Sequence, residues 1–385
     1  MRLLETLVFM GNSWKIGAVC VLLIVAATGF SLVYSHWEQD SDEKPSIGIM
    51  WRPDRNSESF VYTLRAVEAA GGIPVELDPV RSFDFEYGDD GRLKEGVDGN
   101  GILTADAADI VKTGTWHNSN VEDVLKGMDF IIFPGGEDVC PSLYREPQEW
   151  HGIEEECYYS AERDVSDYIA MSYCLDNDIP FLGICRGMQV LAVVSGVSMI
   201  QDIPTYFADM GIEYHNGHRN PVPYPGGYRD YAPHDVTLTG DSVIRGIMGT
   251  GQLSGCPSWH HQGVRSIEGT AFKVTGYTET DGMMMIEGLE RTDKTCAFGI
   301  QYHPEAAVAK YLDDAANKTD YMDYDAALAV FEWVVDYARS VSAGTTRRMR
   351  QAGLFSVGPE LAVRDYSHPP SGGYHYSIKK PNIIK

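Results

Sequence analysis

Basic residues are scarce in this sequence. Lys and Arg number 31 against 55 Asp and Glu, which gives the 385 residues a formal net charge of −24. A surface with such an excess of negative charge repels phosphate backbones, and this argues against a nucleic-acid partner. Much of the surplus lies in runs such as 89–90 and 154–156, and the simplest interpretation of these runs is a solvated surface.

Short metal-binding spacings are absent as well. Without a Cys-x-x-Cys or His-x-x-x-His pair, the sequence predicts no structural zinc site and no bound metal. His215 and His218 stand close together in a Gly-containing segment, and we interpret both as loop-surface residues rather than a metal pair. Some cysteines could form disulfides in an oxidising compartment, but their spacing does not indicate partners. The seven cysteines are Cys20, Cys140, Cys157, Cys174, Cys185, Cys256 and Cys296.

Charged residues are missing from one long run near the N-terminus, Ile16–Tyr34. Its roughly 19 residues match the length that a helix needs to cross a bilayer core. Arg2 and Lys15 precede the run and an acidic stretch follows at 36–43. The positive-inside rule then places the N-terminus in the cytoplasm and the body of the protein, membrane-anchored or exported, on the extracytoplasmic side. A transmembrane anchor and a cleaved signal peptide both fit this pattern.

After a polar linker at 37–45, short apolar runs alternate with stretches of helical periodicity. The pattern predicts strands at 46–50, 73–77, 130–133 and 180–184, and helices at 60–70, 161–177 and 187–194. Strands that are apolar throughout and separated by helices favour a parallel sheet covered on both faces. We therefore predict an α/β fold of three layers with a doubly wound, mostly parallel sheet.

The second half of the chain is richer in strand patterns. Strands are predicted at 234–238, 272–276, 283–287 and 297–301, and a helix at 324–342. The stretch 82–120 is polar with weak periodicity, and we interpret it as a long surface insertion. The expected organisation is an N-terminal segment at 1–36, the linker, one domain at 46–342 and a C-terminal tail at 343–385.

A cysteine with glycines on both sides ends one predicted strand, in the segment Gly183-Ile-Cys185-Arg-Gly187. A nucleophile between two such glycines, where a strand turns sharply into a helix, is the arrangement of a nucleophile elbow. The helix that follows points the positive end of its dipole at the sulfur and favours the thiolate, which is the form that attacks carbonyl groups. Taken alone, this pattern also fits a buried structural cysteine at a strand end.

A histidine follows another predicted strand, in Gly299-Ile-Gln-Tyr-His303-Pro-Glu305. A nucleophilic cysteine needs a base that takes its proton and returns it to the leaving amine, and histidine does this near neutral pH. A nearby carboxylate can hold the imidazole in the required tautomer. His-Pro-Glu by itself is often a turn, but beside the cysteine elbow it predicts a Cys185–His303–Glu305 triad.

A third segment, Pro134-Gly135-Gly136-Glu-Asp138, follows the predicted strand at 130–133. Two glycines at a strand end leave backbone N–H groups free to face a developing oxyanion. The N–H group of Arg186, directly after the nucleophile, would be the second donor. An ordinary loop is the alternative interpretation when this segment is considered alone.

The three segments together resemble the class I glutamine amidotransferase superfamily and, within it, the gamma-glutamyl hydrolase family of stand-alone peptidases. The stretch from Phe133 to Tyr144, the pair Arg163-Asp164 and the segment Trp259-His-His-Gln262 resemble that family too. The resemblance covers roughly 46–342. It implies a flavodoxin-like fold of the superfamily type, to which the N-terminal transmembrane or signal helix is an addition.

The resemblance also implies roles for particular residues. Cys185 would be the nucleophile, His303 the base and Glu305 its orienter, with oxyanion N–H groups from Gly136 and Arg186. The glutamyl moiety would be bound by Gln189 and by a facing wall made of His260, His261 and Gln262. It implies no cofactor and no metal, a small gamma-glutamyl substrate as the partner, and it allows a homodimer.

We therefore predict a cysteine-type gamma-glutamyl peptidase that cleaves gamma-glutamyl amide bonds through a thioester on Cys185. One alternative is a glutaminase subunit that feeds ammonia to a partner synthetase, which would use the same triad. The other alternative is a non-catalytic binding protein on the same fold, although such a protein would be expected to lose the cysteine or the histidine. The sequence does not indicate which leaving group is released.

Overall fold

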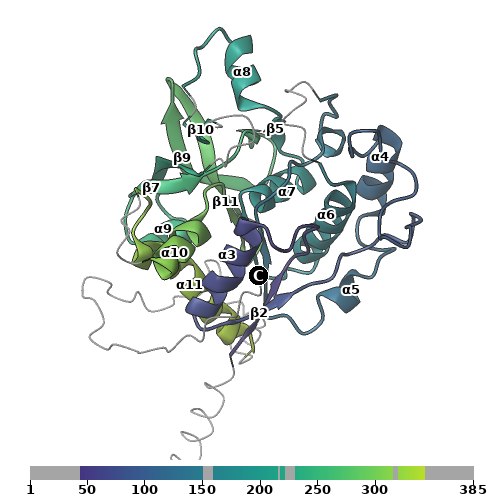
Figure 1. Cartoon of the computed structure of the whole chain (residues 1–385), viewed down its shortest axis with the longest axis horizontal. Coiled ribbons are helices and arrows are strands. Elements are labelled where there is room, and N and C mark those ends of the chain that lie inside the picture. Colours follow the sequence, from purple (N-terminus) through teal and green to yellow (C-terminus); the bar gives the residue numbers. More distant parts are fainter. Residues whose placement is uncertain (1–43, 151–158, 216, 222–229, 315–319, 343–385) are drawn as a thin grey trace, which may run out of the picture.

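The structure is a computed structural model that describes residues 44–150, 159–215, 217–221, 230–314 and 320–342 (Figure 1). These residues form one eleven-stranded sheet with helices on both of its faces. The predicted membrane or signal segment at 16–34 and the tail at 343–385 lie outside them. No helix within the described ranges combines the length and the apolar character that crossing a membrane requires.

One half of the sheet is parallel, as the sequence predicts. In spatial order its strands are β2 (Ile73–Glu76), β1 (Ser46–Ile49), β3 (Phe130–Phe133), β4 (Phe181–Ile184) and β11 (Ala297–Ile300). The carboxyl ends of parallel strands meet at one edge of a sheet, which is where open α/β sheets place their functional groups. The segments that follow β3, β4 and β11 therefore come together there.

The other half of the sheet is antiparallel, so the prediction of a mostly parallel sheet is wrong and the sheet is mixed. Its strands are β10 (Met283–Arg291), β9 (Phe272–Thr280), β6 (Ala232–Leu238) and β7 (Gln252–Ser258), with β8 (Gly263–Ser266) beside β10 and β5 (Ser198–Ile200) beside β8. The physical reason is the short connections, since a parallel neighbour would need a long crossover. Between β9 and β10 only Asp281 and Gly282 remain, both with positive φ, as a tight hairpin requires.

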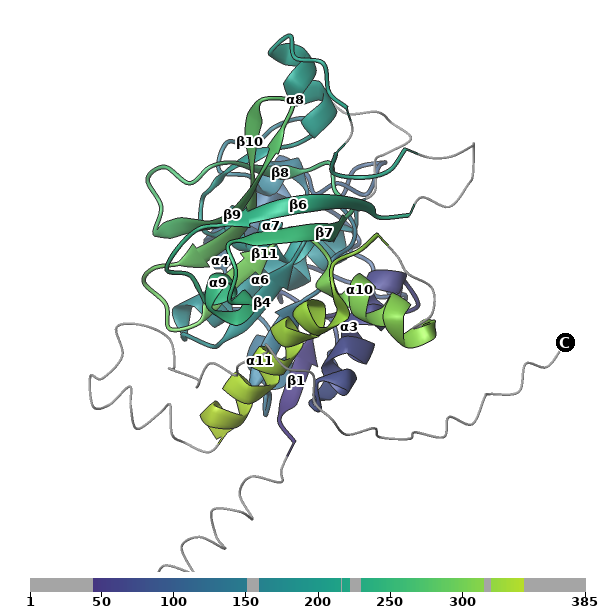
Figure 2. The same ribbon diagram turned by 90° about the vertical axis from the view of Figure 1, so that its left-hand side faces the viewer.

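Two separate apolar cores cover the two faces of the parallel half. Alternation along β3 sends Ile131 and Phe133 into one core and Phe130 and Ile132 into the other. The first core is closed by α4 (Ala105–Gly114), α5 (Val121–Val124), α6 (Ala161–Asp176) and α7 (Arg186–Val194). The second is closed by α3 (Glu58–Ala69), α9 (Val243–Met248), α10 (Pro304–Asp313) and α11 (Tyr324–Ser342), and Figure 2 shows α3, α10 and α11 together beside β1. The predicted three-layer arrangement is thus present.

The stretch 82–120 is more than the surface insertion that its weak periodicity suggests. It contains α4, whose N-cap Thr104 accepts a hydrogen bond from the Ala107 N–H group. Ala108 and Val111 of this helix are buried in the first core beside α6. Only short apolar residues make this contact, so the helix leaves a weak hydrophobic pattern in the sequence.

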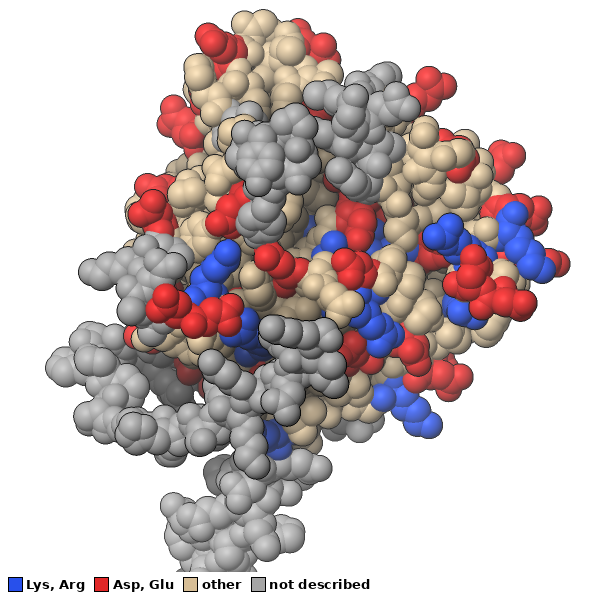
Figure 3. Space-filling model, in the orientation of Figure 1, with Lys and Arg blue, Asp and Glu red and all other residues tan. Residues whose placement is uncertain are grey.

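The sequence predicts that the excess acidic residues lie on a solvated surface, and one face of the molecule shows such residues. Asp and Glu side chains are scattered over that face, with Lys and Arg side chains among them (Figure 3).

Two further short elements complete the described part, the 3-10 helix η1 (Pro141–Leu143) and α8 (Ile203–Asp209), neither of which is expected from the sequence pattern.

Candidate active site

Cys185 occupies the turn between β4 and α7 with φ 50° and ψ −104°, a left-handed conformation that is rare for a residue with a side chain. Its N–H group donates to the Ile300 carbonyl at 2.7 Å, which ties the turn to the neighbouring strand β11. The side chain is 4% exposed. A strained cysteine at a strand-to-helix turn is the geometry expected of a nucleophile elbow.

Both flanking glycines are required by close backbone contacts. A Cβ on Gly183 would lie 2.7 Å from the Met188 nitrogen, and a Cβ on Gly187 would overlap the Phe133 carbonyl oxygen of β3. Because nothing larger than hydrogen fits at either position, α7 can approach the sheet closely enough to hold the turn. The Gly-x-Cys-x-Gly pattern is thus a packing requirement here.

His303 stands directly before α10, in the short segment after β11, which is the strand that pairs with β4. Its Nδ1 lies 2.6 Å from Oε1 of Glu305, whose side chain is fully buried. Burial alone would lower the pKa of His303, but the Glu305 carboxylate and the Cys185 thiolate raise that pKa to about 10. A histidine held by this carboxylate is therefore suited to receive a proton from the cysteine.

The glycine loop after β3 lies against this pair. A Cβ built on Gly135 would lie 2.6 Å from Cε1 of His303 and 3.5 Å from Cβ of Cys185. Gly136 has φ 147°, and a Cβ there would collide with the Arg163 guanidinium. Gly135 is thus the nearer of the two glycines to the cysteine, although Gly136 is the oxyanion donor predicted from the sequence.

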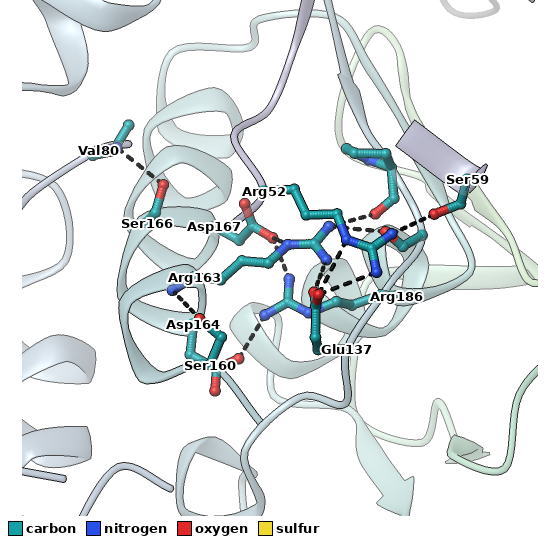
Figure 4. Close-up of polar contacts among 12 residues, drawn as sticks. Arg52, Ser59, Val80, Glu137, Ser160, Arg163, Asp164, Ser166, Asp167 and Arg186 are labelled. Atoms are coloured by element: carbon teal, nitrogen blue, oxygen red, sulfur yellow. Dashed lines mark hydrogen bonds and ion pairs between the residues drawn. The ribbon is translucent and has the colours of Figure 1, made fainter. Parts of the chain in front are cut away.

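A buried charge network supports both the glycine loop and the turn (Figure 4). Arg163 of α6 donates to the carbonyl oxygens of Pro134 and Gly135 at 3.0 Å each and pairs with Glu137. Burial alone would raise the pKa of Glu137, but Arg163 and Arg52 lower that pKa to about 2. The loop carbonyls are therefore turned toward α6 and fixed there.

The side chain of Arg186, the residue after the nucleophile, enters the same network. It donates to Asp164 at 2.6 Å and pairs with Asp167, and all three side chains are almost completely buried. Removing one partner of such a buried set leaves an uncompensated charge, which is strongly destabilising. The first turn of α7 is thereby anchored to α6. In the sequence, Arg163-Asp164 is noticeable only as part of a resemblance, which assigns no role to either residue.

His261 and Gln262, which the resemblance places opposite Gln189 in the substrate pocket, form hydrogen bonds to the glycine loop and the residue after it. His261 lies between Asp202 Oδ1, at 2.9 Å from Nδ1, and Asp138 Oδ2, at 2.8 Å from Nε2. Gln262 accepts a hydrogen bond from the Val139 N–H group at 2.9 Å and donates one to the Val139 carbonyl at 3.1 Å. These polar atoms thus already have protein partners, and they connect the segment after β7 to the segment after β3.

His261 should make the stability of the protein depend on pH. Burial opposes its charge, but Asp138 and Asp202 raise the pKa of His261 to about 9. A raised pKa stabilises the fold fully below the unfolded value near 6.5, and that stabilisation is lost as the pH rises through about 9. We expect the free energy of unfolding, from urea denaturation, to fall by about 1–3 kcal/mol more between pH 6.5 and 9.5 in the native protein than in the His261→Gln variant. Parallel pH curves for the two proteins would contradict this assignment.

Gln189, predicted to bind the glutamyl group, lies one turn into α7. Its Nε2 donates to the Gln262 carbonyl at 3.1 Å and to Oε1 of Gln301 at 3.3 Å.

Two aromatic residues without a predicted role also border the site. The ring of Tyr231 lies 5.0 Å from that of His303, and the Trp259 carbonyl lies 3.8 Å from Sγ of Cys185. Tyr231 has no sequence signal, because it precedes β6 and reaches His303 only through the fold.

The five cysteines of the described residues are all free thiols and all buried: Cys140, Cys174, Cys185, Cys256 and Cys296. Cys185 therefore has no disulfide partner among the described residues. Cys20 and Cys157 lie outside the described residues.

The site combines an elbow cysteine, a carboxylate-held histidine just after the neighbouring strand, and a glycine loop against both. This combination defines a cysteine hydrolase of the glutamine amidotransferase type. Residues 100–305, which include all three triad residues, match the family model of peptidase C26. The chain belongs to the peptidase C26 family, within the class I glutamine amidotransferase superfamily.

The chain is also similar to individual proteins and to solved structures. A putative glutamine amidotransferase-like protein of Rickettsia prowazekii is 24% identical over 316 residues, which cover 71% of this chain and 93% of that protein. A gamma-glutamyl-gamma-aminobutyrate hydrolase of Escherichia coli O157:H7 is 27% identical over 198 residues, or 50% of this chain and 70% of the hydrolase. Among solved structures, a glutamine amidotransferase of Thermotoga maritima is 16% identical with a TM-score of 0.37, over 80% of this chain and 98% of its own.

Proposed function

We propose that this protein hydrolyses gamma-glutamyl amide bonds through a gamma-glutamyl thioester on Cys185. The observation that carries the proposal is the placement of Cys185 on a strained turn beside a histidine whose Nδ1 lies 2.6 Å from a fully buried carboxylate. The gamma-glutamyl hydrolase among the relatives supports the choice of substrate class.

The reaction follows from the positions of these groups. His303 takes the proton of Cys185, and the thiolate attacks the gamma-carbonyl carbon while backbone N–H groups of the glycine loop and of Arg186 receive the negative oxygen. The C–N bond then breaks, and His303 returns its proton to the leaving amine. Water, deprotonated by His303, hydrolyses the thioester and releases glutamate or a gamma-carboxyl product together with the free thiol. Glu305 stabilises the imidazolium at each step.

Gln189 is proposed to bind the glutamyl part of the substrate, whereas the side chain of His260 is directed at Glu287 instead. Gln189 supports this role through its position, since its backbone N–H group bonds the Cys185 carbonyl at 3.2 Å on the same helical turn. For His261 and Gln262 the role would be to hold the glycine loop, because their polar atoms are engaged by Asp138 and Val139.

The choice of the gamma-amide over the alpha-amide tests the substrate class. The full-length protein should release nitroaniline from gamma-glutamyl-p-nitroanilide with a kcat/KM about 100-fold or more above that for the alpha-glutamyl isomer. The reason is that the two isomers place the scissile carbonyl at different distances from the amino and carboxylate groups of the glutamyl part. Equal rates for the two isomers would contradict the gamma-glutamyl assignment while leaving a cysteine hydrolase in place.

A second function, supplying ammonia to a synthetase, is favoured by the names of several relatives, including a putative glutamine amidotransferase of Mycobacterium tuberculosis that is 31% identical over 192 residues. The two functions differ in their leaving group. Glutamine as the preferred substrate among gamma-glutamyl compounds, with ammonia release enhanced by a co-purifying synthetase, would favour this second function. Preference for a gamma-glutamyl amine or peptide would favour the peptidase.

The location of the catalytic domain is a further proposal, based on the charge-free run at 16–34 and the acidic stretch after it. We propose that the domain lies on the extracytoplasmic side. Digestion of the domain by protease added to intact cells or spheroplasts would support this location, and complete protection until lysis would contradict it.

A further inference from the structure

Three buried side chains that the proposed reaction does not use meet behind the active-site segment after β7. They are His218, from the segment after α8, His260 and Glu287 of β10, and one nitrogen or oxygen of each lies within 4.8 Å of the others. The side chains of His218 and Glu287 are fully buried and that of His260 is 3% exposed. A fourth side chain, His234 of β6, faces the same carboxylate.

The hydrogen bonds of His260 leave an electron pair directed at Glu287. Nδ1 of His260 lies 2.8 Å from the Gln262 carbonyl, which only accepts, so Nδ1 carries the proton. With the proton on Nδ1, the neutral ring carries its electron pair on Nε2, which is buried and has no hydrogen-bond partner. This nitrogen lies 3.5 Å from Glu287 Oε1, which is an acceptor as well. Two electron-pair donors thus face each other inside the protein, and a cation between them would satisfy both.

The distances from Glu287 Oε1 to the two imidazole nitrogens, 3.3 and 3.5 Å, are those of ligands around a metal ion. His218 Nδ1 lies 3.3 Å from Glu287 Oε1, which is longer than the roughly 2.7–2.9 Å of a charge-assisted hydrogen bond. Ligand bonds of about 2.0–2.2 Å in a tetrahedral zinc site separate the ligand atoms from one another by roughly 3.3–3.6 Å. In addition, His218 Nδ1, His260 Nε2 and both Glu287 oxygens have no hydrogen-bond partner although they are buried.

We propose that His218 Nδ1, His260 Nε2 and Glu287 Oε1 bind one zinc ion or a similar divalent transition-metal ion. Two imidazoles and one carboxylate favour such an ion over magnesium or calcium, which prefer oxygen ligands. The far side of each ring is held, His218 Nε2 by the Thr280 hydroxyl at 3.0 Å and His260 Nδ1 by the Gln262 carbonyl. Outer contacts of this kind orient metal-binding histidines. His234 Nε2 lies 3.4 Å from the other Glu287 oxygen, at ion-pair rather than hydrogen-bond distance.

The backbone brings the ligands together before any metal binds. The His218 carbonyl accepts hydrogen bonds from the His260 N–H group at 3.1 Å and from the Ser258 hydroxyl at 2.8 Å. The same segment borders the active site, since the Gln262 carbonyl accepts from both His260 and Gln189. A metal ion here would therefore hold the segment that carries the Trp259 carbonyl beside Cys185, and it would act on the reaction only by positioning this wall.

The spacing of residues within one segment does not reveal the cluster of His218, His260 and Glu287, because each ligand comes from a different segment. For this reason the sequence predicts no metal. The interpretation of His215 and His218 as loop-surface residues fits His215, whose side chain is 68% exposed, but is wrong for His218. The ligands are separated by 42 residues (218 to 260) and 27 residues (260 to 287), and they are brought together by the antiparallel half of the sheet.

Zinc binding by the full-length protein tests the proposal. A Cys185→Ala background removes the catalytic thiol, which together with His303 could bind zinc by itself. After chelator treatment and equilibrium dialysis, this protein should take up one zinc ion per chain, and cobalt in its place should give the intense visible absorption of a tetrahedral site. Glu287→Gln and His260→Ala should each weaken zinc binding by about 100-fold or more, and His234→Ala by about 10–100-fold.

His215→Ala is the matched control, because it removes an exposed histidine that bonds Asp281 on a neighbouring turn, and it should leave zinc binding unchanged. A folded Cys185→Ala protein that takes up no zinc and gives no cobalt spectrum would overturn the proposal, whatever the folding of the variants. Equal zinc affinity in folded Glu287→Gln protein would overturn it as well, by placing the metal elsewhere. Zinc content is measured without substrate, so these outcomes are independent of whether gamma-glutamyl amides are hydrolysed.

Discussion

Replacing Cys185 with serine should lower kcat/KM for a gamma-glutamyl amide by about 10⁴-fold or more. A serine hydroxyl is far less acidic than a thiol, so His303 would no longer face a group that ionises readily. The elbow itself should persist, because serine differs from cysteine by one atom and the turn is held by the Ile300 carbonyl and by the flanking glycines. Initial rates with gamma-glutamyl-p-nitroanilide measure the loss.

Cys174→Ser provides the matched control for this substitution. Cys174 is a free, fully buried thiol near the C-terminal end of α6, and a serine there can bond the carbonyl one helical turn earlier. Its kcat/KM per folded molecule should stay within about threefold of the native value. Full activity of the Cys185→Ser protein, or an equal loss in both variants, would contradict the role of Cys185 as nucleophile.

Replacing Glu305 with glutamine should lower kcat by about 10²–10⁴-fold. The amide oxygen can still accept from Nδ1 of His303, so the ring keeps its place. The substitution removes the negative charge of Glu305. That charge raises the pKa of His303, whereas burial lowers it. The imidazolium formed during the reaction would then lack its buried counter-charge, and we expect the apparent pKa values of the pH–rate profile to shift along with the fall in rate.

Glu279→Gln is the corresponding control, since it removes one negative charge from an exposed position on β9. Its rate and its pH–rate profile should match those of the native protein. A Glu305→Gln variant with an unchanged profile would show that the carboxylate does not act through His303.

The sequence is informative about the parallel half of the sheet and about the triad because both depend on local patterns. Apolar strands followed by helices identify β1, β3 and β4, and glycines at 183 and 187 identify the turn whose backbone contacts exclude any side chain. His303 and Glu305 are two residues apart, so their contact needs little from the rest of the fold. The family model of peptidase C26 matches residues 100–305, which include this triad, and the resemblance stated from the sequence is thereby confirmed.

The parts that escaped prediction depend on contacts between distant segments. The Asp281–Gly282 hairpin signal is local, yet the antiparallel order of β10, β9, β6 and β7 follows only when several strands are placed together. Arg163 and Arg186 enter a network with carboxylates from other elements. Glu287 resembles an ordinary strand residue until the fold brings three histidines around it.

Capture of the acyl-enzyme tests the central claim most directly. The full-length protein would be mixed with a gamma-glutamyl amide, quenched in acid within the first turnovers and digested, and the peptide containing Cys185 would be weighed by mass spectrometry. We expect a gamma-glutamyl group attached to Cys185, labile to hydroxylamine and more abundant when Glu305 is replaced by glutamine and deacylation is slowed. Substrate turnover without any adduct on Cys185, or an adduct on another residue, would contradict the role of Cys185 as the nucleophile.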